Sequence, residues 1–179
     1  MIEEYIYQKV SKIDEEGCRE EYVLRYDNKE GECKKWYSGA EGQLMEQYYY
    51  KNGKEEGEYK SWYSTGQLDA QCYYKEGKEE GKYIWWYENG QLEIECYYKE
   101  GKEEGDYKKW YSTGQLNIQC YYKEGELEGE YKRWWWNGEL MKQSYYKNGK
   151  LEGEYNKNSW FNFIIKKMRK VIQNLFSIY

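Results

Sequence analysis

The chain has 179 residues, a net charge of −5, 34% charged residues and 39% hydrophobic residues. This composition supplies too little apolar material for an ordinary compact core. The aromatic residues, which make up 21% of the chain, nevertheless exclude a typical disordered protein, because disordered chains are poor in aromatics. We therefore expect a folded protein whose apolar surface is spread thinly.

Histidine and proline are both absent from the sequence. Without histidine the chain cannot build a Ser-His-Asp or Cys-His nucleophile, or the zinc sites that use imidazole. We expect no enzyme, no metal site and no cofactor. Without proline, the 18 glycines have to make the sharp turns, so glycine should mark where strands end.

The first residues predict a protein that stays in the cell. Glu3 and Glu4 lie where a secretory signal has basic residues, and no run of 18 apolar residues follows anywhere. Five cysteines, an odd number, favour reduced thiols over a disulfide framework. We expect a cytoplasmic location.

A repeat dominates the sequence after a degenerate leading unit at residues 1 to 30, in which Gly17 and the run from Tyr22 to Tyr26 are the remnants. Glycines recur every 24 residues at Gly57, Gly81, Gly105, Gly129 and Gly153, and Gly31 precedes them by 26. The two extra residues fall between Ser38 and Gly42 and predict a longer turn there. Residues 31 to 155 therefore form a repeat array.

Each unit has two runs rich in aromatic and β-branched residues, separated by turn dipeptides such as Asn89-Gly90 and Glu100-Gly101. This pattern predicts β-hairpins. The fold class is all-β, an elongated single-layer antiparallel meander of repeated hairpins. At about 4.8 Å per strand, some dozen strands give a ribbon of roughly 50 to 60 Å.

Two-residue turns fix a register that can be tested. The turn at Asn89-Gly90 pairs Tyr87 with Leu92, Trp85 with Ile94, and Tyr83 with Cys96. The turn at Glu100-Gly101 pairs Tyr98 with Glu103, Cys96 with Gly105, and Ile94 with Tyr107. Both turns place the same side chains on one face, and the second continues the first without a slip.

The register sorts the aromatic and apolar side chains onto two faces. One face should carry Tyr59, Tyr83, Tyr107 and Tyr131, Tyr63, Tyr87 and Tyr111, Leu68, Leu92, Leu116 and Leu140, and Tyr74, Tyr98, Tyr122 and Tyr146. The opposite face should carry the tryptophan row, Trp36, Trp62, Trp86, Trp110 and Trp134, near Tyr49, Tyr73, Tyr97, Tyr121 and Tyr145.

The pattern becomes helical in residues 156 to 179, where Phe161, Ile164, Ile165, Met168 and Ile172 follow a spacing of three and four. We expect an amphipathic helix from about residue 160 to 177 with Asn158 or Ser159 as its N-cap. Its polar face is basic. The helix either covers the apolar end of the array or binds an anionic membrane surface.

The recurring cysteines and the recurring glutamate pairs are both expected to have structural roles and not catalytic or metal-binding ones. Cys72, Cys96 and Cys120 lie two strands, about 10 Å, apart, which is too far for a disulfide or a tetrahedral metal site, so a core role is expected. Glutamate pairs such as Glu79-Glu80 point to opposite faces and predict solvated edges instead of an acid and base pair.

The tryptophan row admits two interpretations. Its rings could simply cover a half-exposed sheet and pack on lysine stems. Alternatively, a repeated flat aromatic surface could bind a partner, because Trp and Tyr are enriched among interface hot spots. On the second interpretation the candidate binding residues are Trp36, Trp62, Trp86, Trp110, Trp134, Tyr73, Tyr97 and Tyr121.

The unit from Gly81 to Leu92, Gly-Lys-Tyr-Ile-Trp-Trp-Tyr-Glu-Asn-Gly-Gln-Leu, and the stretch from Tyr97 to Gly105 resemble the MORN repeat in its type 2 variant. The resemblance covers Gly31 to Tyr155 and implies repetitive hairpins used as a binding scaffold, with an antitoxin-like role. The family prefers Leu where this chain has Glu55, Glu79 and Glu103.

Charge narrows the partner. Residues 1 to 155 hold 23 basic and 33 acidic residues, a net of −10, which disfavours nucleic acid and suits a basic protein surface. The leading hypothesis is a non-enzymatic scaffold that sequesters a toxin or a nuclease-type effector. A membrane scaffold anchored through residues 160 to 179, and a structural oligomer joined through free edge strands, remain as alternatives.

Overall fold

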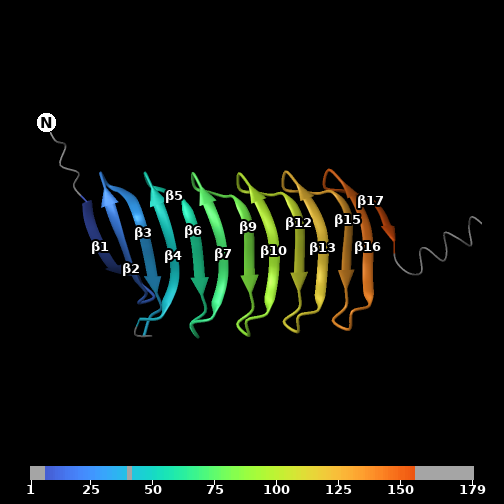
Figure 1. The fold of residues 1–179 in the computed structure, drawn as a ribbon, viewed down its shortest axis with the longest axis horizontal. Helices are drawn as coiled ribbons and strands as arrows, with labels where there is room; N and C mark the ends of the chain where they lie inside the picture. The colour runs from blue at the N-terminus through green and yellow to red at the C-terminus, as the bar shows by residue number, and fades with distance from the viewer. Residues whose placement is uncertain (1–6, 40–41, 156–179) are drawn as a thin grey trace, which may run out of the picture.

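The computed structural model describes residues 7–39 and 42–155, and its regular structure is entirely β (Figure 1). There are thirteen long strands and four short strands of two residues each. The long strands are β1 (Tyr7–Ile13), β2 (Arg19–Arg25), β3 (Asn28–Trp36), β4 (Leu44–Lys51), β6 (Gly57–Trp62), β7 (Leu68–Lys75), β9 (Gly81–Trp86), β10 (Leu92–Lys99), β12 (Gly105–Trp110), β13 (Leu116–Lys123), β15 (Gly129–Trp134), β16 (Leu140–Lys147) and β17 (Lys150–Tyr155). The short ones are β5 (Lys54–Glu55), β8 (Lys78–Glu79), β11 (Lys102–Glu103) and β14 (Glu126–Leu127).

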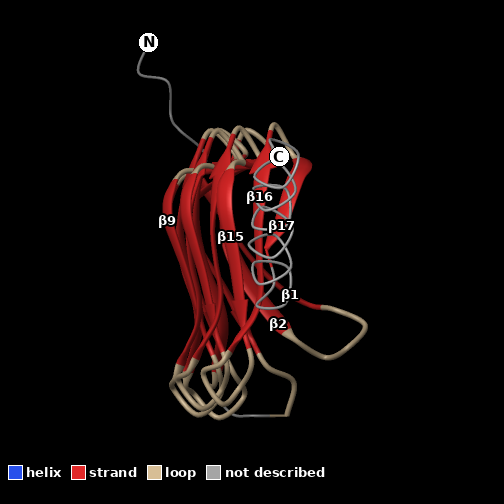
Figure 2. Ribbon diagram, turned by 90° about the vertical axis from the view of Figure 1, so that its right-hand side faces the viewer, coloured by secondary structure: helices blue, strands red, loops and turns tan. Residues whose placement is uncertain are grey.

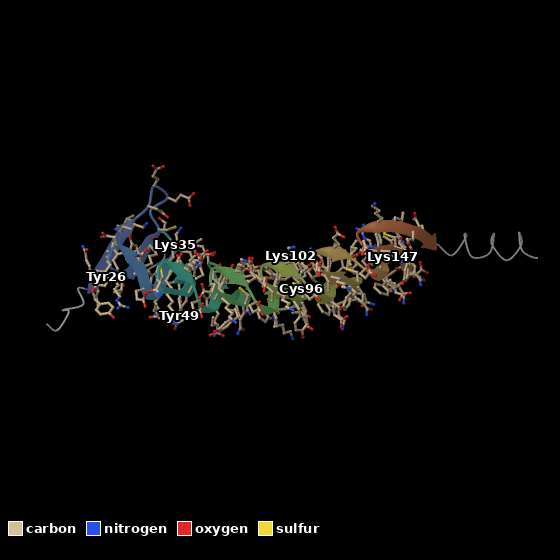
Figure 3. The ribbon with its side chains drawn as sticks, turned by 90° about the horizontal axis from the view of Figure 1, so that it is seen from above. Tyr26, Lys35, Tyr49, Cys96, Lys102 and Lys147 are labelled. Carbon is tan, nitrogen blue, oxygen red and sulfur yellow. The ribbon has the colours of Figure 1, made fainter. Side chains whose placement is uncertain are left out.

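Each long strand pairs antiparallel with the next long strand, so the described residues form one continuous meander. Each two-residue strand pairs with the long strand that precedes it. Figure 2, turned by 90°, shows the strands lying one behind another with the turns gathered at two edges. Figure 3 shows side chains standing off both sides of the ribbon. The predicted single-layer meander is confirmed, and the predicted C-terminal helix lies outside the described residues.

The turns at one edge depend on a left-handed backbone. In each of them both central residues have positive φ, as at Glu76 (53°) with Gly77 (80°) and Glu100 (52°) with Gly101 (79°). This is the geometry of a tight hairpin turn that matches the twist of its strands. The predicted longer turn near residue 40 is confirmed. The hydrogen bond that closes this turn runs from Tyr37 N to Gln43 O, and its counterpart in the next unit runs from Tyr63 N to Gln67 O, so the first turn is two residues longer.

The predicted register is confirmed in part. Ile94 lies opposite Trp85, Cys96 opposite Tyr83, and Tyr98 opposite Glu103. Leu92, however, lies opposite Trp86 instead of Tyr87, because one extra residue, Glu93, bulges from β10. The same bulge recurs in the hairpins formed by β3 and β4, β6 and β7, β12 and β13, and β15 and β16.

The predicted pairs of Cys96 with Gly105 and Ile94 with Tyr107 are wrong. Ile94 lies opposite Lys109, because the chain gains two residues between Glu103, which lies opposite Tyr98, and Lys108, which lies opposite Glu95. A slip of two residues preserves the face on which each side chain lies, because the strand period is two. Thus the face assignment for β12 survives although its register does not.

The bulge in each hairpin moves the leucines to the other face. Residues directly opposite each other share a face of the sheet, and each of these leucines lies opposite a tryptophan: Leu68 with Trp62, Leu92 with Trp86, Leu116 with Trp110 and Leu140 with Trp134. The prediction that the leucines and the tryptophans lie on opposite faces is therefore wrong. We call this side of the sheet the tryptophan face and the other the cysteine face.

The core lies on the cysteine face. Its centre is a line of buried small side chains: Cys33, Cys72, Cys96, Cys120 and Ser144. Each lies opposite a tyrosine, and neighbouring tyrosine rings pack edge-on over the line, as Tyr107 does on Tyr122 with ring centres 5.7 Å apart. All five cysteines of the chain are free and buried, which confirms the predicted core role of Cys72, Cys96 and Cys120.

Candidate protein-binding face

A row of exposed tyrosines runs along the tryptophan face. Each of these residues is between 38% and 48% exposed, because no other described element covers this face. The row comprises Tyr49, Tyr73, Tyr97, Tyr121 and Tyr145. Three of its members, Tyr73, Tyr97 and Tyr121, were predicted as binding residues from the sequence. We call this set the tyrosine row.

All five predicted tryptophans are half-buried on the same face. In β6, Glu58 lies opposite Tyr73 while Trp62 lies opposite Leu68, so four residues, or about 13 Å, separate the tryptophans from the tyrosine row along each strand. The structure therefore places the two sets of predicted residues on one face but does not bring them together. A leucine lies opposite each tryptophan across its hairpin, and the guanidinium of Arg19 lies 4.2 Å from the centre of the Trp36 ring.

The backbone of the tryptophan row is held by the preceding unit. Tyr63 donates its hydroxyl to the carbonyl of Trp86 at 2.8 Å, and Tyr87 donates to that of Trp110 at 2.8 Å. The same bond joins Tyr37 to Trp62 and Tyr111 to Trp134. These tyrosines therefore brace successive units, a role that the sequence analysis did not find although their 24-residue spacing was visible.

A band of paired charges separates the two rows on the tryptophan face. In β6 the carboxylate of Glu58 accepts from Lys60 at 2.7 Å and from Gln71 at 2.7 Å. Glu32 and Glu130 are bound in the same way by a lysine two residues on and a glutamine across the hairpin. In the unit of Gly81 the pair is Lys82 with Glu95, at 2.9 Å.

The glutamate pairs at the turn edge bind the neighbouring unit. Glu80 accepts a hydrogen bond from the backbone N of Glu100 at 2.9 Å, and Glu104 accepts one from the backbone N of Glu124 at 2.8 Å. The first glutamate of each pair lies on the cysteine face. In the pair Glu55-Glu56, for example, Glu55 accepts a hydrogen bond from the Tyr50 hydroxyl at 3.0 Å. The interpretation of these residues as solvated edges was therefore incomplete, because they stabilise the turns of the array.

A charged cluster closes the N-terminal end of the cysteine face. The carboxylate of Glu20, only 12% exposed, accepts from Lys12 at 2.8 Å and from Lys29 at 2.7 Å. Burial alone would raise the pKa of Glu20, but the hydrogen bonds from the two lysines outweigh it and lower this pKa to about 2. The carboxylate therefore stays ionised, and its ion pairs hold β1, β2 and β3 together.

The buried cysteines are chemically protected. Burial raises the pKa of the Cys72, Cys96 and Cys120 thiols to about 12, so little reactive thiolate forms near neutral pH. Within residues 7–39 and 42–155 no group of three or more Cys, Asp or Glu side chains could hold a metal ion. The described part of the chain also contains no helix long and apolar enough to cross a membrane.

The comparisons identify the repeat. The family model described as a MORN repeat variant matches residues 55–76, 79–100, 103–124, 127–148 and 142–156, which together cover more than half of the chain. The chain therefore belongs to the MORN repeat family, and the predicted resemblance is confirmed. A comparison with curated proteins found no match. Repeats of this family generally bind proteins or membranes.

Proposed function

We propose that this protein is a non-enzymatic scaffold that binds and sequesters a protein partner with a basic surface, such as a toxin or a nuclease-type effector. The observation that carries the proposal is the tyrosine row, a line of solvent-exposed rings on a face that no other described element covers. Contiguous exposed apolar patches mark interaction sites, and tyrosine is enriched among the residues that dominate binding energy.

Charge supports a basic protein over the other partners. Residues 1 to 155 carry a net charge of −10, which repels nucleic acid and anionic lipid and attracts a basic surface. The unpaired, buried thiols suit a reducing compartment, so we place the interaction inside the cell. An inhibitor would act by covering the basic groove with which such an effector binds nucleic acid.

The experiment is photo-crosslinking in cells of the source organism. A benzophenone amino acid is placed at Tyr97 or Tyr121, and a matched control carries it at Arg133, which is exposed on the cysteine face. The proposal predicts that one polypeptide is cross-linked from both tyrosine positions and not from Arg133. Cross-linking that is absent, or equally strong from Arg133, would refute it.

Two alternatives from the sequence stay predictions. Membrane anchoring would act through residues 160 to 179, and flotation of the full chain on anionic vesicles, lost on deleting those residues, would favour it. Oligomerisation would use the outer edge of β1, which pairs with β2 alone within the described residues. A sedimentation coefficient that is independent of concentration and fits a monomer would exclude that second alternative.

A further inference from the structure

Two hollows on the tryptophan face share Tyr121 and Asp106. One, of about 520 Å³, lies between Tyr97 and Tyr121, and the other, of about 320 Å³, lies between Tyr121 and Tyr145. Asp106 lies directly opposite Tyr121 across the hairpin of β12 and β13. The two hollows therefore form one stretch along the tyrosine row, with Asp106 at its centre.

The hollows exist because glycine begins each of these strands. Gly105 has φ of +95°, a conformation that L side chains rarely adopt, and a Cβ built there would lie 4.0 Å from the Cβ of Tyr97. Tyr97 and Tyr121 are two strands, or about 10 Å, apart, and between them β12 contributes only Gly105 and the short side chain of Asp106. This leaves room for a flat group to stack on either ring.

The side chains around the hollows are mostly acidic. Glu80, Glu104 and Asp106 line the first hollow, with Lys99 as the one cation. Glu80 and Glu104 each use Oε2 to bind a backbone amide, which leaves Oε1 available to a ligand. In the second hollow the one lysine is bound to Glu130 at 2.6 Å and is not a competitor for Asp106.

Asp106 differs from its counterparts in the other units. The equivalent carboxylates of Glu58 and Glu130 are each bound by a lysine and a glutamine. Asp106 is shorter by one methylene, and within the described residues it makes no hydrogen bond or ion pair with Lys108 or with Gln119. It is thus a free carboxylate between exposed aromatic rings.

We infer that this stretch binds an arginine side chain of the protein partner, with the guanidinium stacked on Tyr97 or Tyr121 and hydrogen-bonded to Asp106. A guanidinium is flat, is weakly hydrated and donates two parallel hydrogen bonds to a carboxylate, whereas a lysine ammonium offers a compact charge without a stacking plane. This inference rests on the proposed function, because it names the group by which the basic partner is recognised.

The test compares two peptides of equal charge. Fluorescein-labelled octa-arginine and octa-lysine are titrated with the full chain, and binding is followed by fluorescence anisotropy. We expect octa-arginine to bind about tenfold more tightly than octa-lysine. The Asp106→Asn variant should weaken octa-arginine binding about tenfold, the lower end of the range for one lost hydrogen bond to a charged group.

The matched control is Glu58→Gln, which removes the same charge at the equivalent position where the carboxylate is already bound. It should change octa-arginine binding less than twofold. Tyr121→Leu should lower the preference for arginine over lysine, because it removes one stacking surface. Circular dichroism establishes that each variant is folded, which the exposure of Asp106 and Tyr121 favours.

Equal affinity for the two peptides, or an Asp106→Asn effect no larger than that of Glu58→Gln, would overturn the inference. This outcome is distinct from failure of the proposed function. If a partner is still cross-linked from Tyr97 and Tyr121, only the assignment to arginine is wrong. If no partner is cross-linked there, the proposed function is wrong as well.

Discussion

Exchanging Tyr107 and Cys120 tests how the single layer is packed. The two residues lie opposite each other on the cysteine face, where Cys120 is buried beneath the tyrosine rings. The first unit already contains the reverse arrangement, with Cys33 opposite Tyr48, and there Tyr48 packs edge-on against Tyr50 with ring centres 5.6 Å apart. One large and one small side chain therefore fill each hairpin in either order.

The magnitudes follow from volume. Tyr107→Cys leaves a cavity and should lower the free energy of unfolding by about 3 kcal/mol. Cys120→Tyr overfills the line of small residues and should cost about 2 kcal/mol. The double exchange conserves volume, so it should cost about 1 to 2 kcal/mol and show a coupling of about 3 kcal/mol.

The assay is urea unfolding followed by tryptophan fluorescence for the parent, the two single variants and the double variant. A double variant whose loss equals the sum of the single losses within about 0.5 kcal/mol would refute this reasoning. It would mean that the two side chains do not share one packed space.

Three further predictions concern bonds and groups named above. Tyr87→Phe should cost about 1 kcal/mol of unfolding free energy, because it removes the hydrogen bond to the Trp110 carbonyl, and urea unfolding measures this. Glu20 has a folded pKa of about 2, below its ordinary value of 4.5, so its stabilisation is full above pH 4.5 and is lost as the pH falls toward 2. The loss should be about 2 kcal/mol, less than the full shift implies because Lys12 is 53% exposed, and Glu20→Gln should abolish this part of the pH dependence of unfolding. Cys96, 1% exposed, should not react with Ellman's reagent at pH 8 until the protein is unfolded in denaturant.

Each of these has its own control. Tyr97→Phe, whose hydroxyl makes no hydrogen bond within the described residues, should leave stability unchanged, and an equal loss in both variants would contradict the bracing role of Tyr87. If the parent and Glu20→Gln lose stability in parallel below pH 4.5, the ion pairs of Glu20 contribute nothing. Immediate reaction of thiols in the native protein would show that the cysteine face opens readily.

Much of the fold could be predicted because the repeat shows the same pattern several times. Glycine positions located the turns, and the pairs of Trp85 with Ile94 and Tyr83 with Cys96 followed from counting residues away from one turn. The period of two then fixed which face is packed. These features depend on local geometry alone.

The bulge could not be predicted from the same counting. Glu93 adds one residue to β10, and nothing in its identity distinguishes it from a regular strand residue. Because one residue reverses the face, the whole set of leucines was assigned to the wrong side. The two-residue slip between Glu103 and Lys108 had no such effect, because a shift of two residues leaves each side chain on the same face.

The sequence indicated which face of the sheet carries the candidate site, but not which row of residues on that face is most exposed. Tyr73, Tyr97 and Tyr121 were named from the sequence, yet their greater exposure than the tryptophans was not predicted, because the bulge that places a leucine opposite each tryptophan has no signal in the sequence. The free carboxylate of Asp106 had a visible signal, since aspartate replaces glutamate there in the repeat. Its consequence required the side-chain distances in the neighbouring units.

The central claim is that the tyrosine row carries the partner contact. The most direct measurement takes the partner that cross-linking identifies, purifies it in its free form and titrates it calorimetrically with two variants of this chain. Our account predicts that Tyr97→Ser with Tyr121→Ser weakens binding by several kcal/mol, about two hot-spot truncations, while the array stays folded. Trp86→Ser with Trp110→Ser should act mainly on stability, because these half-buried residues form cross-strand pairs with Leu92 and Leu116. Parent-like binding by the folded tyrosine variant, with binding lost in a folded tryptophan variant, would contradict the account.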